Sequence, residues 1–215
     1  VSEDVADCFV AEEGETQEDA LRKWQATQEQ ARSASDESYV AFRGFEWSNQ
    51  RMGHMNIFFS DNFTNAVVDG GMVTMEVFWE WFTRRPEFGG GSDGLAVFNH
   101  PGREDPFMGN DPAFTWNDFE YIPEAAPRVI GIEVFNRSSR DNYAEFYVRA
   151  LNKGWRLAPI GSEDEHGQDW GASDLGKTVL VARDLTEPAL RAAMLERRMY
   201  ALLDDDDNTP DVVED

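Results

Sequence analysis

The sequence predicts an α/β domain built on a largely parallel sheet or barrel. Short apolar runs with the length of buried strands alternate with segments whose apolar residues recur at helical spacing. The chain has 215 residues, of which 41% are hydrophobic, so we expect one domain with a substantial core. We assign residues 1–203 to this domain and residues 204–215 to a solvated acidic tail.

The N-terminal part is expected to hold one helix and two strands. Apolar residues recur at helical spacing after Thr16, which predicts a helix that ends near Ser33. Residues 38–45 are rich in strand-forming side chains, and residues 57–59 form a second short apolar run. The segment between residues 61 and 72 is expected to be a loop.

Helices and strands are expected to alternate through the rest of the chain. Apolar stripes bounded by capping residues, proline or glycine predict helices at residues 74–85, from Ser139 or Asp141 to Gly154, and at residues 186–198. Continuous apolar runs predict buried strands at residues 95–98 and 129–135, and further strands are expected at residues 156–160 and 178–182. Residues 103–127 are expected to form a long surface loop, and such loops are often functional.

The chain is strongly acidic, with a formal net charge of −23. Such a surface repels nucleic acid and anionic membranes, because both are bound through basic side chains. We interpret the charge as a halophile's surface, in which carboxylates hold water and salt screens their mutual repulsion. An acidic surface that binds cations is the alternative interpretation.

Cysteine content and hydropathy narrow the class of protein further. The single cysteine, Cys8, excludes an internal disulfide and a cysteine-rich zinc site. No apolar stretch approaches the length of a transmembrane helix, and no signal peptide is visible. We therefore expect a soluble protein, either cytoplasmic or exported from a halophile.

Candidate metal ligands lie next to the expected strands. Glu46, His100 and Asp164 each follow a strand, His166 lies two residues beyond Asp164, and His54 precedes a strand. Functional residues of α/β folds gather at the carboxyl ends of strands, and carboxylate and imidazole groups are common ligands of divalent ions. We therefore predict a metal site formed by these residues.

Five segments follow one another in an order and spacing that resemble a known family. They are GFEWS (44–48), GHMNIFF (53–59), NHPG (99–102), GIEVFN (131–136) and GSEDEHG (161–167). Over about residues 36–203 they resemble the PHP superfamily, named for polymerase and histidinol phosphatase, and most closely its carbaryl-hydrolase-like metallohydrolase branch. The resemblance implies a distorted (β/α) barrel that holds two or three divalent ions, which are zinc, manganese or iron, and hydrolyses phosphoesters or other esters.

The resemblance also implies roles for the candidate ligands. Glu46 matches the bridging glutamate, His100 the histidine of the NHP turn, Asp164 and His166 the closing Asp-x-His pair, and His54 the GH element of this branch. On this basis Glu46, His100 and Asp164 are the expected catalytic residues. In a complete site, these residues would hold ions that lower the pKa of a bound water molecule and so would supply hydroxide for attack on the ester.

One departure from the family pattern lies upstream. The family begins with a strand that bears His-x-His, but no histidine precedes His54 in this chain. A barrel without its first strands would expose sheet edges, which natural folds avoid. We therefore expect an upstream segment or another chain to complete the barrel.

The expected substrate is a small anionic ester. Arg103 and Arg137 lie beside two of the family segments, where a guanidinium group can clamp an anion, and Asn136 is a further candidate for substrate binding. Pairing with surface carboxylates is the alternative role for both arginines.

A non-catalytic binding or structural protein is the competing function. It is favoured by the missing upstream histidines and by an aromatic, loop-rich surface, whose tryptophans suit a protein interface. These are Trp47, Trp79, Trp81, Trp116 and Trp170.

The halophilic interpretation predicts a strong dependence of stability on salt. We expect the protein to unfold on transfer from molar to low salt, because the repulsion among its carboxylates is then unscreened. Far-ultraviolet circular dichroism across a salt series measures this. A signal that does not change with salt would contradict the interpretation.

Overall fold

The computed structural model describes residues 17–68, 71–102, 115–136, 141–166 and 176–203. A six-stranded sheet lies at its centre, with the strand order β1-β2-β5-β6-β7 and with β8 paired to β6. These strands are β1 (Gly44–Asn49), β2 (Gly53–Phe58), β5 (Leu95–Asn99), β6 (Val129–Asn136), β7 (Asp141–Asn142) and β8 (Ala158–Ser162). Two antiparallel hairpins complete the described strands: β3 (Val67–Val68) with β4 (Gly71–Met72), and β9 (Gly176–Leu180) with β10 (Met199–Leu203).

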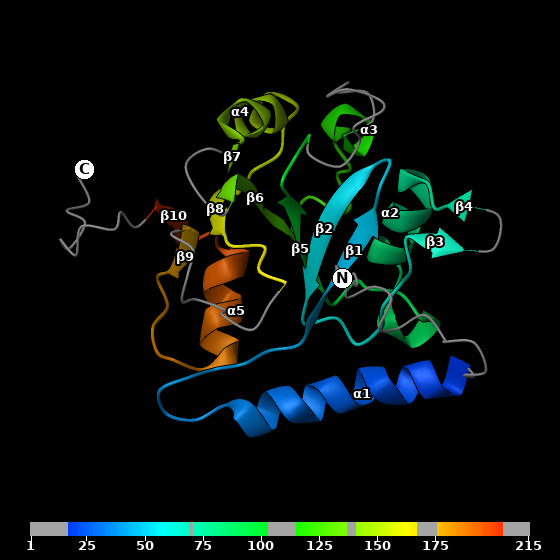
Figure 1. Cartoon of the computed structure of the whole chain (residues 1–215), viewed down its shortest axis with the longest axis vertical. Coiled ribbons are helices and arrows are strands. Elements are labelled where there is room, and N and C mark those ends of the chain that lie inside the picture. The colour runs from blue at the N-terminus through cyan, green and yellow to red at the C-terminus, as the bar shows by residue number, and fades with distance from the viewer. Residues whose placement is uncertain (1–16, 69–70, 103–114, 137–140, 167–175, 204–215) are drawn as a thin grey trace.

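Helices surround this sheet (Figure 1). They are α1 (Gln17–Ala34), α2 (Met75–Thr83), α3 (Trp116–Phe119), α4 (Ala144–Asn152) and α5 (Glu187–Leu195). The four residues of α3 have positive φ angles, so this element is a short left-handed turn. No helix in the described part of the chain is long and apolar enough to cross a membrane.

The sheet is mixed, and the described strands do not close it into a barrel. Strand β6 pairs in parallel with β5 and β8, as the alternating pattern predicts, whereas β2 is antiparallel to both β1 and β5. Beyond β8, the Thr178 hydroxyl of β9 donates to the carbonyl oxygen of Gly161 (2.7 Å) and accepts from its N–H (3.1 Å). Among the described strands, β1 has a neighbour on one side only.

The antiparallel start of the sheet corrects the expected strand at residues 38–45. Strand β1 begins at Gly44 and continues to Asn49, where the chain reverses. The side-chain oxygen of Asn49 accepts hydrogen bonds from the N–H groups of Arg51 (3.1 Å) and Met52 (2.9 Å), which fixes the turn. Glu46 therefore lies inside a strand rather than after one.

Most other expected elements are confirmed with shifted ends. The helices expected before Ser33, at 74–85 and at 186–198 are α1, α2 and α5, and the strands expected at 95–98, 129–135, 156–160 and 178–182 are β5, β6, β8 and β9. Strands β5 and β6 are largely buried, whereas most residues of β9 are only partly buried. Helix α4 begins after Tyr143 rather than at Asp141, which belongs to β7, and Ser139 lies outside the described residues. Strand β10 of the hairpin was not expected: it begins at Met199, directly after the end of the last predicted helix at residue 198. Most of the expected loop at 103–127 and the tail at 204–215 also lie outside the described residues.

Two apolar cores pack on opposite faces of the sheet. The larger core joins α2 to alternate residues of the strands, among them Trp47, Met55 and Phe98. The smaller core joins Met194 of α5 to residues of the other face, such as Leu95. The tryptophans expected at a surface are buried in the larger core, with 0% of Trp47, 6% of Trp79 and Trp81, and 1% of Trp116 exposed; Trp170 lies outside the described residues. The structure thus corrects that expectation.

The larger core predicts a matched pair of stability changes. Phe78 of α2 is fully buried, and its ring lies 4.5 Å from that of Trp47. We expect Phe78→Ala to lower the free energy of unfolding by about 3–5 kcal/mol, because it leaves a cavity. We expect Phe88→Ala, at a side chain that is 68% exposed, to change it by less than about 0.5 kcal/mol. Urea unfolding in high salt measures both, and equal losses would contradict the assignment of this core.

Candidate metal centre

Three potential metal ligands meet at one edge of the sheet. Glu46 lies in β1, His54 lies near the start of β2, and His100 directly follows β5. Because β2 runs opposite to both of its neighbours, its beginning lies beside the ends of β1 and β5. His54 is paired in register with Asn99, which brings it next to His100.

The spacing of the ligand atoms fits a single metal ion. Nδ1 of His54 lies 3.1 Å from Nε2 of His100 and 3.4 Å from Oε1 of Glu46, and the last two atoms are 3.8 Å apart. A tetrahedral ion with bonds of about 2.0–2.1 Å separates its ligands by about 3.3 Å. Among groups of three or more His, Cys, Asp or Glu residues in the described part of the chain, this is the one whose ligand atoms all lie within 4.8 Å of one another.

The cluster is buried and held by neighbouring amides. The side chains of Glu46, His54 and His100 are 14%, 10% and 5% exposed. Nδ2 of Asn99 donates to Oε1 of Glu46 (2.8 Å), and Nε2 of Gln50 lies 3.3 Å from Nε2 of His54. Such contacts orient the donor atoms before an ion binds.

Glu46 is ionised at neutral pH. Burial by itself would raise the pKa of its carboxyl group, but the hydrogen bond from His54, the charge of His54, the hydrogen bond from Asn99 and the charge of His100 together lower this pKa to about 2. The cluster therefore offers a cation a negatively charged oxygen in a site with little access to water.

A second carboxylate, Glu133 of β6, contacts both the backbone and the ring of His100. Glu133 is 2% exposed, and its Oε2 accepts hydrogen bonds from the backbone N–H of His100 (2.6 Å) and from Nδ2 of Asn136 (3.0 Å). The same oxygen lies 3.4 Å from Nδ1 of His100. His100 has a φ of 25°, which is unusual for a residue with a side chain. Glu133 therefore fixes both the backbone and the ring of this ligand.

Sequence reasoning missed the role of Glu133. The residue lies within the quoted segment GIEVFN, in the middle of a strand, whereas the predicted ligands lie beside the ends of the expected strands. A carboxylate in the middle of an apolar strand is the signal that could have found it, because buried charges are rarely tolerated without partners.

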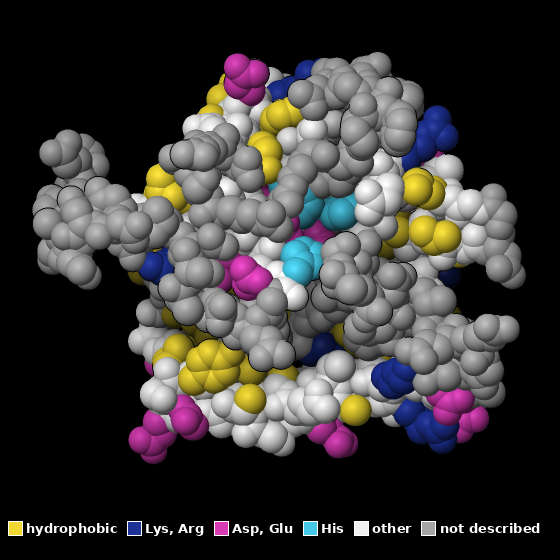
Figure 2. All heavy atoms as spheres, in the orientation of Figure 1, with side chains coloured by type: hydrophobic (Ala, Val, Ile, Leu, Met, Phe, Trp, Pro, Cys, Tyr) yellow, Lys and Arg dark blue, Asp and Glu magenta, His cyan; other side chains and the backbone are white. Residues whose placement is uncertain are grey.

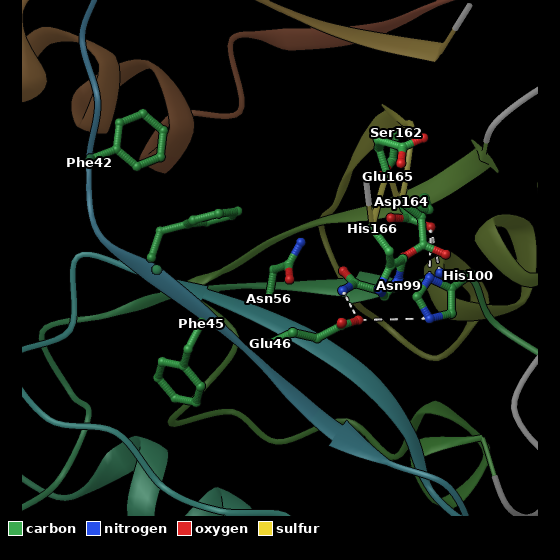
Figure 3. Close-up of a pocket in the computed structure, with 13 residues that line it drawn as sticks. Phe42, Phe45, Glu46, Asn56, Asn99, His100, Ser162, Asp164, Glu165 and His166 are labelled. Carbon is green, nitrogen blue, oxygen red and sulfur yellow. Dashed lines mark hydrogen bonds and ion pairs between the residues drawn. The ribbon is translucent and has the colours of Figure 1, made fainter. Parts of the chain in front are cut away.

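Asp164 and His166 lie in the same pocket but outside this cluster. They follow β8 in a loop rather than in a strand, with Asp164 at a φ of 51°. Nε2 of His166 is 3.0 Å from Oδ1 of Asp164, so the predicted pair is in contact. Together with Glu46, His100 and Glu133 the two residues line a pocket of about 490 Å³ (Figure 3). Histidine side chains (cyan) and acidic side chains (magenta) are visible at the centre of the face shown in Figure 2.

Of the three remaining predicted site residues, the structure describes one. Asn136 is fully buried, and its side chain donates to Glu133. Arg103 and Arg137 lie outside the described residues.

Comparisons with known proteins give a similarity of fold. No protein-family model matches this sequence, and no curated protein matches it. The fold is similar to a crystal structure from Bacteroides vulgatus ATCC 8482, that of a two-domain protein containing a predicted PHP-like metal-dependent phosphoesterase. The TM-score is 0.51 with 22% identity, over 85% of this chain and 49% of that one. The chain therefore spans about half the length of that protein.

A second crystal structure, that of PsfC from Pseudomonas syringae PB-5123, gives a TM-score of 0.49 with 16% identity. That match covers 86% of this chain and 72% of PsfC.

The contacts of Glu133 predict an indirect effect on metal binding. We expect Glu133→Ala to weaken the affinity for zinc by about 10–100-fold, as is typical for residues that hold a metal-ligating histidine. Glu133→Gln keeps an acceptor for the N–H of His100, so we expect a smaller loss. Calorimetric titration with zinc measures both, and an unchanged affinity in Glu133→Ala would contradict the role.

Proposed function

We propose that this chain is a metal-dependent hydrolase of the PHP superfamily that cleaves a phosphoester or another ester. The observation that carries the proposal is the buried cluster of Glu46, His54 and His100, two members of which, Glu46 and His100, line a pocket large enough for a small substrate. The similarity of fold to a protein that contains a predicted PHP-like phosphoesterase supports the family, and the quoted sequence segments support it independently.

The donor set fits a divalent ion such as zinc, manganese or iron. Oxygen and nitrogen donors together suit these ions, and Oδ1 of Asn99 is buried without a hydrogen-bond partner among the described residues, as expected beside a site that binds a further group. When bound, the ion supplies Lewis acidity and an activated water molecule. In this proposal Glu46, His54 and His100 hold the ion, and Glu133 and Asn99 orient two of these ligands.

Asp164 and His166 complete the proposed site. They reach the pocket from the other side of β6, and we assign them a part in binding a further ion, with Asp164 as a catalytic residue. Arg103, Arg137 and Asn136 remain our candidates for contact with an anionic group of the substrate. We place the chain in the carbaryl-hydrolase-like branch, because the GH element of that branch supplies His54.

The open sheet supports the proposal that an upstream segment or another chain completes a distorted barrel. Among the described strands, β1 pairs with β2 and presents its other edge without a partner strand. An unpaired edge next to a site is a position where a further strand can add both hydrogen bonds and ligands.

A non-catalytic binding protein is our second candidate function, and it is favoured by the lack of a His-x-His pattern within these 215 residues. Its other support has weakened, since the described tryptophans belong to the core. Metal binding decides between the two functions.

The proposal predicts metal in the purified protein. In protein prepared without chelator and in high salt, we expect at least one equivalent of zinc, manganese or iron by mass spectrometry. We expect His100→Ala and Glu46→Gln to lose this metal and the hydrolysis of phosphoesters and esters, because each removes one ligand.

Glu87→Gln is the control for the change of Glu46, since it removes an exposed carboxylate and should keep the metal. Folded protein without any transition metal would rule out the hydrolase and leave the binding protein.

A further inference from the structure

The pocket continues along the sheet from the metal cluster to a group of aromatic rings. Side chains on one face of a sheet alternate along each strand, so His54, Asn56 and Phe58 of β2 share a face. Phe42 and Phe58 line one part of the pocket, whereas Glu46 and His100 line another. In Figure 3, Asn56 lies between Phe42 and the group formed by Glu46 and His100.

Phe42 and Phe58 form an apolar corner. Their ring planes are nearly perpendicular, at 88°, with centroids 5.8 Å apart. Phe42 is braced from another side by Phe59, whose ring centroid is 4.7 Å away. A flat ring placed in such a corner would contact the face of one phenylalanine and the edge of the other, which are both favourable arrangements.

Gly44 allows the ring of Phe58 to pack closely against β1. A Cβ atom at residue 44 would lie 2.9 Å from Cδ1 of Phe58 and 2.9 Å from the carbonyl oxygen of Ile57. The ring of Phe58 therefore packs directly on the backbone of β1 at Gly44, where a larger side chain would not fit.

The side chain of Asn56 faces the stretch between the cluster and the corner. Asn56 is partly exposed, and its amide makes no hydrogen bond to any residue that the structure describes. Each step of two residues along a strand covers about 7 Å, so Asn56 separates the corner from the cluster by a distance of this order on either side. A polar linker of a ligand would meet this amide.

The charges around the pocket restrict the ligand further. The described residues that line it include Glu46, Glu133, Asp164 and Glu165, but no lysine or arginine. A negative charge on the ligand is therefore favoured at the metal and disfavoured elsewhere in the described pocket.

We propose that the substrate carries an uncharged ring, which packs against the corner formed by Phe42 and Phe58, joined by a short polar linker to the ester that reacts at the metal. This inference rests on the proposed function for the position of the ester. The ring, the linker and the ester then match the corner, Asn56 and the cluster in order along β2.

Binding of two phosphonates, which are not hydrolysed, tests the inference. Methylphosphonate presents only the anionic group, whereas 2-(phenylacetamido)ethylphosphonate adds a ring on an amide-containing linker that can pass beside Asn56. With the zinc-loaded protein in high salt, we expect calorimetry to give at least about tenfold tighter binding of the second probe, because its ring is buried against two aromatic side chains.

Three variants test whether Phe42 and Phe58 cause the tighter binding of the phosphonate that carries a ring. Phe58→Leu and Phe42→Leu keep the corner apolar but remove one ring, so each should reduce the preference to about threefold or less. Phe63→Leu is the matched control, because Phe63 is a partly buried ring of the other core and should leave the preference unchanged. Two separate corner variants keep the test valid if one of them fails to fold.

The outcomes for the ring and for the metal are distinguishable. Equal affinity for the two phosphonates, or a preference that neither corner variant lowers, would overturn the ring site while leaving the metal function intact. If the protein binds no metal, saturation-transfer NMR of the phenyl protons with metal-free protein decides the inference. A signal that Phe58→Leu removes upholds the ring site, and no signal overturns it.

Discussion

The direction of β2 is the constraint on which the candidate site depends. A parallel strand in this position would carry His54 to the opposite edge of the sheet, far from Glu46 and His100. Because β2 is antiparallel to both β1 and β5, its beginning meets their ends, and the register with β5 places His54 beside Asn99. The turn held by Asn49 is what makes this reversal possible.

Because side chains alternate along β1 and β2, one face of these strands packs in the core and the other carries the candidate metal ligands. One face of β1 and β2 supplies Trp47 and Met55 to the aromatic core under α2. The other face supplies Glu46 and His54, and it leaves a pocket where a larger apolar core would otherwise form. Polar ligands are thus held on strands whose rigidity comes from the opposite face.

Much of the fold could be predicted from the sequence, because periodicity and apolar runs reflect local structure directly. Helices α1, α2 and α5 and strands β5 and β6 were found in this way. The predicted ligands Glu46, His54 and His100 do come together. The strand direction that unites them was not predicted, because no hydrophobic pattern states which strands pair or in what sense.

The features that the sequence did not predict depend on contacts between segments that are distant in the sequence. Glu133 acts through the backbone and ring of His100, and contacts between residues so distant in the sequence are visible only in the folded chain. The closed barrel was inferred from family resemblance, whereas the described strands form an open sheet. Alternating elements predict an α/β sheet but do not determine whether its edges meet.

The distribution of the three ligands along the chain has a consequence for folding. Glu46 and His54 belong to one hairpin, so they can approach each other as soon as that hairpin forms. His100 joins them only after β5 has paired with β2 across the intervening loop and α2. An ion that needs all three donors therefore binds the native chain in preference to partly folded forms, and it stabilises the native state by about 2.7 kcal/mol at a hundred times its dissociation constant. The ion would thus act as a long-range crosslink as well as a cofactor.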